Sequence, residues 1–285
     1  MIANLSIDNS PKFLSIFSSA SNCIYKNLAL EEWLFRNKNY FNEDILLIWR
    51  NSPSVVIGRY QNPWIETNMN FCNQNKIKIV RRYSGGGAVY HDMGNFNISL
   101  LTSHNRHNRK ENLKRLSKQD DLIVEPNNSK ISGTAARISN GKAYHHFTLL
   151  VNPNMMNLHL SLQSSLKDNI ETTATKSIKA KSVGSLVELV KIKENKDEEI
   201  MKKTEKKINS DILPCEEYFP GIEKTISLLK SDDWIFNKTP KFRIQFNKDE
   251  YINVQNGIIL ESTSNKFPIG EHFKKLFFMN KTKTN

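Results

Sequence analysis

The sequence is poor in cysteine and lacks any apolar run long enough to cross a membrane. Its three cysteines, Cys23, Cys72 and Cys215, form no C-x-x-C pair, which excludes a disulfide framework and a cysteine-ligated zinc site and favours a reducing compartment. The longest apolar runs, at 45–49 and 147–151, fall far short of the roughly 20 residues that a transmembrane helix needs. We therefore expect neither a metal site nor a membrane partner.

Acidic residues are also scarce relative to basic ones. The chain has 41 lysines and arginines against 29 aspartates and glutamates, which gives a net charge of +12. A basic balance favours an anionic partner, which can be nucleic acid, an acidic protein surface or a phosphorylated ligand. The lysines are spread along the chain and form no Arg-rich tract, so we do not expect a nucleic-acid partner.

Short apolar segments separated by turns predict an α+β fold. Residues 27–35 carry Leu30 and Leu34 four positions apart, which is the spacing of a helix with an apolar stripe. Strands are predicted at 45–49, 55–57, 77–80, 96–100 and 146–151. The charged stretch at 191–207 predicts a solvated linking helix. No βαβ rhythm is present, which argues against a doubly wound sheet.

The most informative segment is RRYSGGGAVYHDMGN, at 81–95. Three consecutive glycines leave backbone amides unshielded and allow positive φ values, so the main chain can approach a ligand closely. Such a loop can hold a phosphate through its N–H groups, and Arg82 can add a charge-assisted contact. The pattern is neither a P-loop nor a Rossmann fingerprint. The alternative interpretation is a plain glycine-rich turn.

A second informative segment is KISGTAA, which begins at Lys130 and is followed by HHFTLL from His145. A lysine before Ser-Gly can place its ammonium group against a phosphoryl or carbonyl oxygen, although an exposed surface lysine is the commoner case. Adjacent residues on a strand point to opposite faces, so His145 and His146 cannot both bind one metal ion. We expect one of them to be buried and hydrogen-bonded and the other to be exposed.

These motifs, in this order, resemble the lipoate-protein ligase A and lipoyltransferase family, and most strongly its mitochondrial lipoyltransferase branch. The segments NSPSVVIGRYQNPW, FPGIEK and WIFNKTPKF are also similar to that branch, so the resemblance covers about 22–242. It implies an α+β catalytic domain like that of biotin protein ligases, a mixed sheet with flanking helices and a long acyl tunnel. The expected parts are a presequence or flexible N-terminus at 1–21, the catalytic domain at 22–207 and a small, abbreviated accessory domain at 214–285.

The resemblance also implies a site for lipoyl-AMP as acyl donor. Lys130 matches the family lysine that contacts the acyl carbonyl and the adenylate phosphate, and it is the catalytic candidate. The other residues that the resemblance assigns to lipoyl-AMP binding are Arg82, Ser84, Gly85, Gly86, Gly87, Ala88, Val89, Tyr90, Asn95 and Thr148. No general base is identified; His91 and His146 are candidates for a base or for structural support.

The activity that the resemblance implies is transfer of a lipoyl group from lipoyl-AMP, or from a lipoylated carrier protein, to a lysine. The implied acceptors are lipoyl domains of the E2 subunits of 2-oxoacid dehydrogenase complexes and the glycine cleavage H protein. Acidic acceptors would complement the +12 charge. A monomer in mitochondria is expected, although residues 1–20 carry only Lys12 as a basic residue and give little presequence signal.

Two alternatives remain open at this point. One is a full ligase that makes the adenylate from lipoate, ATP and magnesium. The other, from a different class, is an inactive protein that only binds lipoyl-AMP or lipoyl domains. An octanoyltransferase with a cysteine nucleophile is disfavoured, because no cysteine lies in the Lys130 segment.

Two segments depart from the family pattern. Between Arg115 and Asp121 the chain is shorter than is usual in the family, and Gln119 stands where an arginine is expected. The C-terminus also looks abbreviated. The first departure predicts a weakened substrate wall and the loss of one phosphate contact.

Overall fold

The computed structural model describes residues 13–108, 123–124, 129–178, 180, 182–187 and 210–281. Several predictions lie outside these residues: most of the presequence, the short segment between Arg115 and Asp121, and the charged helix at 191–207. Among the described residues, no helix has the length and apolar character needed to cross a bilayer.

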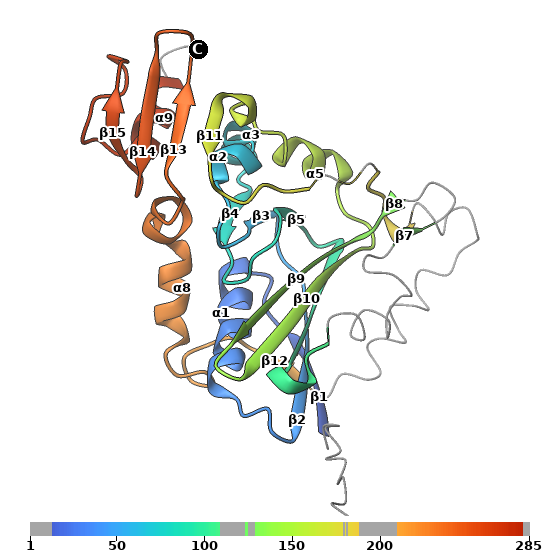
Figure 1. The fold of residues 1–285 in the computed structure, drawn as a ribbon. Helices are drawn as coiled ribbons and strands as arrows, with labels where there is room; N and C mark the ends of the chain where they lie inside the picture. Colours follow the sequence, from blue (N-terminus) through green and yellow to red (C-terminus); the bar gives the residue numbers. More distant parts are fainter. Residues whose placement is uncertain are drawn as a thin grey trace, which may run out of the picture.

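The central element is a mixed six-stranded sheet (Figure 1). Its first three strands are parallel and the remaining pairs are antiparallel. The strand order is β12 (Ser210–Ile212), β1 (Phe13–Ser19), β2 (Glu43–Trp49), β6 (Asn95–Ser103), β10 (Lys142–Leu150) and β9 (Ser132–Ser139). The mixed sheet confirms the expected α+β class.

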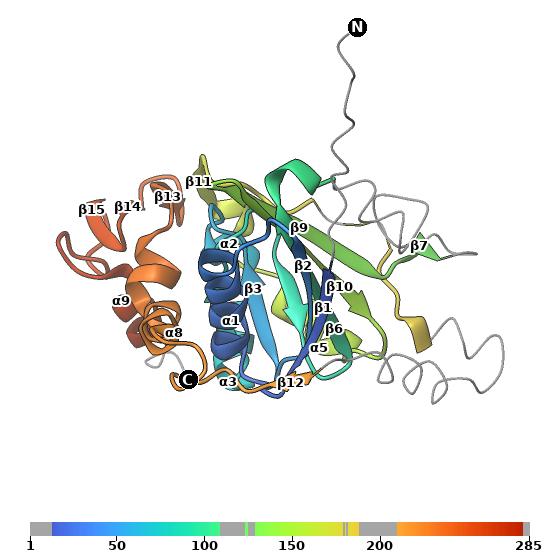
Figure 2. The same cartoon turned by 90° about the horizontal axis from the view of Figure 1, so that it is seen from below.

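Helix α1 (Ile24–Asn37) covers one face of this sheet (Figure 2). Its buried Leu28, Leu30 and Leu34 share a core cluster with Leu47 of β2 and Leu101 of β6. Burying a leucine side chain contributes about 1.5–3 kcal/mol, so the predicted apolar stripe is what fixes the helix on the sheet. The prediction of a helix at 27–35 is confirmed, and the helix extends beyond it at both ends.

The alternation at 96–100 correctly predicts strand β6, but the polar residues are the more buried ones. Asn97 and Ser99 are 2% and 0% exposed, while Phe96 and Ile98 are only partly buried. The polar face of β6 points toward α1, where hydrogen-bond partners are available. The strand predicted at 146–151 is also longer than expected, and a turn with positive φ at Asn140 and Gly141 joins it to the unpredicted β9.

A small three-stranded sheet carries the glycine-rich segment. Strand β3 (Ser54–Ile57) lies between β4 (Lys78–Arg81), which is parallel to it, and β5 (Val89–His91), which is antiparallel. The loop from 82 to 88 joins β4 to β5. Three short helices, α2 (Pro63–Glu66), α3 (Met69–Gln74) and α5 (Met155–Ser161), lie around this sheet (Figure 1). The strands predicted at 55–57 and 77–80 are therefore present.

The C-terminal region forms a four-stranded sheet with a helix, α9 (Phe273–Lys281). Its strand order is β11 (Ile170–Thr172), β13 (Phe242–Gln245), β14 (Tyr251–Gln255) and β15 (Ile258–Ser262). Strand β11 comes from the expected catalytic segment, so the small sheet is not built from 214–285 alone. Its core also takes in Trp64 and Ile65 of α2.

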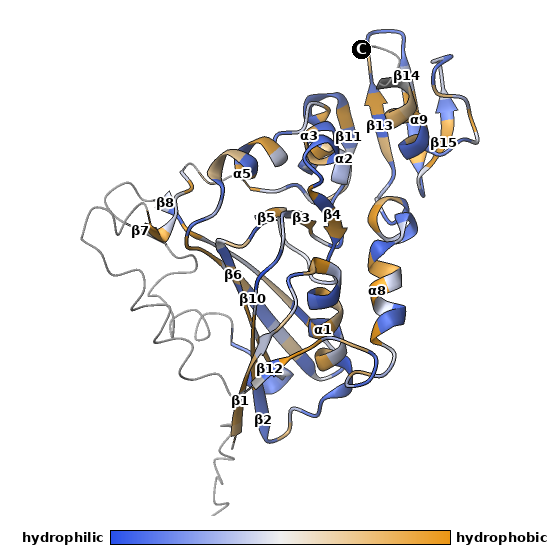
Figure 3. Cartoon of the chain, turned by 180° about the vertical axis from the view of Figure 1, so that it is seen from behind, coloured by the Kyte–Doolittle hydropathy of each residue, from blue (hydrophilic) through white to orange (hydrophobic). Residues whose placement is uncertain are grey.

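Helix α8 (Ile222–Lys230) attaches this region to the central sheet by packing against α1. It is amphipathic (Figure 3): Ile222, Ile226 and Leu229 are buried in the same core cluster as α1, while Glu223 is exposed. The remaining described elements are β7 (Ile123–Val124), β8 (Ser129–Lys130), and the short helical turns η1 (His104–Arg106), η2 (Lys167–Asn169) and η3 (Asp233–Asn237).

Arg81, the last residue of β4, joins the C-terminal region to the small sheet through backbone carbonyls. The side chain is completely buried. Its Nε donates to the carbonyl oxygen of Trp234 at 2.9 Å, its Nη1 to that of Gln61 at 2.7 Å, and its Nη2 to that of Ile235 at 2.6 Å. In return the indole Nε1 of Trp234 donates to the carbonyl oxygen of Arg81 at 2.7 Å. Two chain segments more than 150 residues apart are thus held by one guanidinium group.

We predict that Arg81→Met lowers the free energy of unfolding by about 3 kcal/mol or more, because several buried carbonyls lose their donor at once. Urea denaturation followed by tryptophan fluorescence measures the change. Lys78→Met, on the exposed part of the same strand, is the matched control. Equal stability of the two variants would contradict the role given to Arg81.

Candidate functional site

A cavity of about 520 Å³ lies between the glycine-rich loop, the β9–β10 hairpin, α5 and the segment 175–178. One end, called the closed end here, is formed by Leu28, Trp49 and Val56, none more than 2% exposed. The other, called the open end, includes Ile178, which is 98% exposed. The cavity thus runs from the apolar core to solvent, a shape suited to an elongated ligand with one apolar and one polar part.

The buried side chain of Arg82 holds the glycine-rich loop through hydrogen bonds. The side chain is 3% exposed. Its Nη1 donates to the carbonyl oxygen of Val56 at 3.0 Å, its Nη2 to that of Gly87 at 2.8 Å, and its Nε to the Ser84 hydroxyl at 3.0 Å. Desolvation lowers the pKa of Arg82 to about 10, so the group stays charged at neutral pH. Since Nε and Nη2 bind the loop and Nη1 binds β3, Arg82 supports the cavity wall and does not present an unengaged guanidinium to a phosphate.

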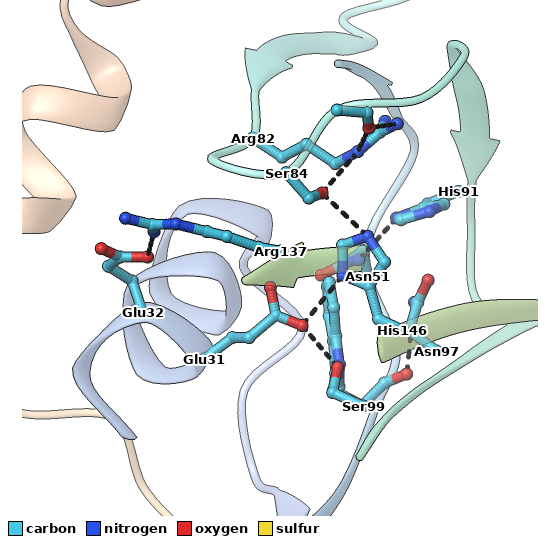
Figure 4. Close-up of polar contacts among 12 residues, drawn as sticks. Glu31, Glu32, Asn51, Arg82, Ser84, His91, Asn97, Ser99, Arg137 and His146 are labelled. Carbon is cyan, nitrogen blue, oxygen red and sulfur yellow. Dashed lines mark hydrogen bonds and ion pairs between the residues drawn. The ribbon is translucent and has the colours of Figure 1, made fainter. Parts of the chain in front are cut away.

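A buried chain of hydrogen bonds continues from Arg82 into the core (Figure 4). The Ser84 hydroxyl lies 3.0 Å from Nε2 of His146, and Nδ1 of His146 lies 2.9 Å from Oε1 of Glu31. Ser99 donates to the same carboxylate oxygen at 2.5 Å. Because a carboxylate accepts, Nδ1 of His146 carries a proton, and Nε2 is engaged with the Ser84 hydroxyl. Both ring nitrogens are engaged, so His146 is a structural residue in this arrangement rather than a base.

The other histidine of the pair points to the opposite face of β10. His145 is 1% exposed, and its ring lies near those of His107 and Phe147. The expectation that the two histidines face opposite ways is correct. The expectation that one of them is exposed is wrong, because the β10 strand is covered on both faces at this point.

His91 is held in a neutral form. Its Nδ1 lies 3.0 Å from Nδ2 of Asn51, which can only donate, so Nδ1 accepts and the proton is on Nε2. Burial, together with the positive charge of Arg82 and the neighbouring His146, lowers the pKa of His91 to about 3. The basic nitrogen is already occupied, and the geometry therefore does not support His91 as a base.

Lys130 stands on the cavity wall with Gly133 and Thr148. The lysine is half-buried, and its strand is held by backbone hydrogen bonds from its own N–H to Ser182 and from Gly184 to its carbonyl oxygen, at 3.0 and 3.2 Å. The Gly133 amide donates to Oγ1 of Thr148 at 2.9 Å. Because both the N–H and the carbonyl oxygen of Lys130 are hydrogen-bonded, its backbone is fixed. The side chain can therefore place its ammonium group only within a limited part of the cavity.

Three residues that the motifs did not predict, Gln61, Glu66 and Ser177, are hydrogen-bonded to one another beside the glycine-rich loop. The Ala88 amide donates to Oγ of Ser177 at 2.8 Å, and Nε2 of Gln61 donates to the same oxygen at 3.0 Å. The Ser177 amide in turn donates to Oε1 of Glu66 at 3.0 Å. In the sequence, Gln61 lies in the segment 51–64 that resembles the family, and Glu66 follows that segment two residues later. No sequence pattern connects either residue with Ser177. A ligand oxygen that binds the Ala88 amide must share it with this hydroxyl or displace it.

The sequence matches the family model described as lipoyl protein ligase A/B catalytic domain over residues 23–119 and 111–209. These matches together span more than half of the chain. The chain belongs to the lipoyl protein ligase A/B family. A mitochondrial lipoyl amidotransferase of Mus musculus is 38% identical over 250 residues, which cover 80% of this chain and 67% of that protein. Lipoate-protein ligase A of Psychrobacter cryohalolentis is 34% identical over 262 residues, which cover 80% of this chain and 74% of that protein.

Solved structures of the same family have a similar fold. P. falciparum LipL1 in complex with lipoate aligns with a TM-score of 0.59 at 26% identity, covering 86% of this chain and 82% of that one. A lipoate-protein ligase A bound with ATP aligns with a TM-score of 0.55 at 21% identity, covering 79% of this chain and 98% of that one, which shows the fold alone.

The cavity brings together most residues that the family resemblance assigns to the ligand. The predicted residues that line it are Arg82, Gly86, Gly87, Ala88, Val89, Tyr90, His91, Lys130, His146 and Thr148. Ser84 and Gly85 are not among the lining residues. Asn95 is buried and donates through Nδ2 to Oδ1 of Asn97 at 3.2 Å, and it is Asn97 that lines the cavity. Among the described residues, no group of three or more His, Cys, Asp or Glu side chains is arranged to hold a metal ion.

Gly86 is the glycine that this family loop most clearly requires. It has φ of 84°, and an added Cβ would lie 3.0 Å from Nη2 of Arg82. We predict that Gly86→Ala lowers the free energy of unfolding by about 1–2 kcal/mol, because an L side chain is strained in the left-handed region. Gly85→Ala, where a Cβ meets nothing within 4 Å, is the control and should change stability by less than about 0.5 kcal/mol. Thermal unfolding of both variants checks this; a smaller loss for Gly86→Ala than for Gly85→Ala would refute it.

Proposed function

We propose that this protein is a lipoyltransferase that moves a lipoyl group from lipoyl-AMP to a lysine of an acceptor lipoyl domain. The observation that carries the proposal is the cavity itself, which joins a buried apolar end to a glycine-rich loop and a wall lysine, Lys130. Family membership and the relatives named lipoyl amidotransferase and lipoate-protein ligase support the same chemistry.

In the proposed complex the acyl chain occupies the closed end beside Leu28, Trp49 and Val56, and the phosphate lies near the glycine-rich loop. The acceptor amine attacks the acyl carbonyl carbon, the bond from that carbon to the phosphate oxygen breaks, and AMP leaves with the electron pair. Starting from the lysine ammonium ion, two protons are released. The ammonium group of Lys130 stabilises the negative charge that develops on the carbonyl and phosphate oxygens. The buried apolar end keeps water from the anhydride.

The acceptor's lysine must lose a proton before it attacks, since its ordinary pKa is about 10.4. Nδ1 of His91 and Nε2 of His146 are both engaged within the protein, at Asn51 and Ser84. Solvent at the open end is therefore the proposed destination of both protons. Rate enhancement then comes from alignment of the two reactants and from electrostatic stabilisation, which together can supply many orders of magnitude.

For partners, we propose acidic lipoyl domains of E2 subunits and the glycine cleavage H protein, with the enzyme acting as a monomer. The +12 net charge supports an acidic acceptor and makes the association sensitive to salt. A mitochondrial location is proposed because the mouse and human relatives are named mitochondrial.

A full ligase that uses ATP and magnesium is the second candidate. The 34% identity to a lipoate-protein ligase A is the observation that favours it. An inactive protein that binds lipoyl-AMP or lipoyl domains remains the alternative from another class. The presence of Lys130 together with Gly86 and Gly87 of the glycine-rich loop on one cavity supports an enzyme over a binding protein.

The deciding measurement is the intact mass of an unmodified lipoyl domain after incubation with the protein. We expect lipoylation from lipoyl-AMP, and a loss of about 100-fold or more in rate for Lys130→Ala, because one charge-stabilising donor is removed. Lys248→Ala, an exposed lysine of the C-terminal region, is the matched control.

Parallel reactions with lipoate, ATP and magnesium separate the candidates. Lipoylation only from lipoyl-AMP supports a transferase, and lipoylation from both supports a ligase. A folded protein that binds lipoyl-AMP but modifies no lipoyl domain would overturn both enzyme proposals.

A further inference from the structure

The closed end of the cavity contains a hydrogen-bond donor that no described residue accepts. Nε2 of His91 is buried, and no partner lies within hydrogen-bond distance of it among the residues that the structure describes. The side chain is 3% exposed and lines the cavity beside Trp49, with ring centroids 6.0 Å apart. An unsatisfied buried donor is costly, so its retention at a ligand cavity indicates a contact that the ligand completes.

The protonation state of this nitrogen is fixed by a chain of amides that begins on α1. Nδ2 of Asn27 donates to Oδ1 of Asn51 at 2.9 Å, which turns Nδ2 of Asn51 toward His91. Asn27 is itself oriented, because its Oδ1 accepts from the Ser19 hydroxyl at 2.6 Å. Each amide thus has an assigned orientation, and His91 is left as the tautomer with its proton on Nε2. Figure 4 shows the Asn51–His91 pair at the edge of the polar network.

Other polar groups at the closed end are already engaged. Nε1 of Trp49 donates to Ser99 at 3.2 Å, and Oδ1 of Asn97 accepts from Asn95. His146 uses both ring nitrogens, as described above. The charged or titratable groups that face His91 are Arg82 and His146, and they favour its neutral state. Among the described residues, the closed end therefore combines an apolar lining with the neutral N–H donor of His91.

Two acyl chains of similar length differ in how they meet this donor. An octanoyl chain ends in hydrocarbon and gives the N–H no acceptor. A lipoyl chain ends in a dithiolane ring, whose sulfur atoms are weak acceptors and pack well against an aromatic ring such as that of Trp49. A site with a buried donor discriminates against a ligand that leaves the donor unpaired.

We propose that His91 is a specificity-determining residue that favours the lipoyl over the octanoyl group by donating Nε2–H to a dithiolane sulfur. The inference rests on the proposed function, since it assigns the closed end to the acyl chain. It concerns acyl selection, and it is separate from the catalytic role proposed for Lys130.

The kinetic test compares kcat/KM for lipoyl-AMP and octanoyl-AMP. The wild-type protein should prefer lipoyl-AMP by about fivefold to tenfold, as expected for one weak hydrogen bond. In His91→Phe the preference should disappear, because lipoyl transfer falls more than octanoyl transfer does. In His91→Gln the preference should be largely restored, because the Gln side-chain amide places an N–H near the position of Nε2. His104→Phe, an exposed histidine of η1, is the matched control and should keep the wild-type ratio.

A binding readout checks the tautomer independently of turnover. In ¹⁵N-detected imidazole spectra, His91 should appear as the Nε2–H tautomer and should not titrate between pH about 5 and about 8. The Nε2 signal should move when a stable sulfamate analogue of lipoyl-AMP binds, and much less with the octanoyl analogue. An unchanged melting temperature shows that a variant is folded.

The outcomes separate the two proposals. The same lipoyl-to-octanoyl ratio in wild type and His91→Phe, or equal Nε2 shifts with both analogues, overturns the role of His91 and leaves the transferase proposal intact. Absence of transfer from both adenylates in the wild-type protein overturns the proposed function, and the Nε2 shifts then decide by themselves whether His91 recognises the lipoyl analogue.

Discussion

Two consecutive buried arginines fix the positions of the glycine-rich loop and of the C-terminal region. Arg81 and Arg82 are 0% and 3% exposed, and their recorded partners are backbone carbonyl and hydroxyl oxygens. Burying a guanidinium group is costly unless every donor is used, so each arginine requires a cage of acceptors in fixed positions. Adjacent residues at a strand end point to opposite sides. Arg81 therefore fixes the C-terminal region, while Arg82 fixes the glycine-rich loop.

Because the two arginines are adjacent, their hydrogen bonds connect distant parts of the chain. The carbonyls of Trp234 and Ile235 are placed by Arg81, and the loop carbonyls of Gly85 and Gly87 by Arg82. Because the glycines lack side chains, the loop has little packing of its own, and its shape comes mainly from the arginine beneath it. The positively charged side chain that resembles a ligand-binding group in the sequence is thus a scaffold for the backbone amides that face the cavity.

The sequence predicted the parts of the site that depend on local patterns. Three glycines in a row and a lysine before Ser-Gly are readable without a structure, and Gly86, Gly87 and Lys130 line the cavity. The contact of Ser177 with Ala88 was not predictable, because it joins segments 89 residues apart with no periodic pattern. The burial of the polar face of β6 was not predictable from the sequence for a related reason. Alternation identifies a strand, but only the partners on Glu31 and Trp49 determine that Ser99 faces inward.

The hydrogen-bond donors at the two ends of the cavity differ in whether they already have a partner. This difference affects which ligands bind. At the loop, the Ala88 amide is already satisfied by Ser177, so a phosphate oxygen that binds there replaces one hydrogen bond with another and gains little net free energy. At the closed end, the His91 donor has no described partner, so a ligand acceptor adds an interaction. For the proposed adenylate donor, selectivity between ligands that share the same phosphate would then come from the acyl group. In the proposed transfer, this exchange would also favour release of AMP, because the Ser177 hydroxyl can accept from the Ala88 amide again as the product leaves.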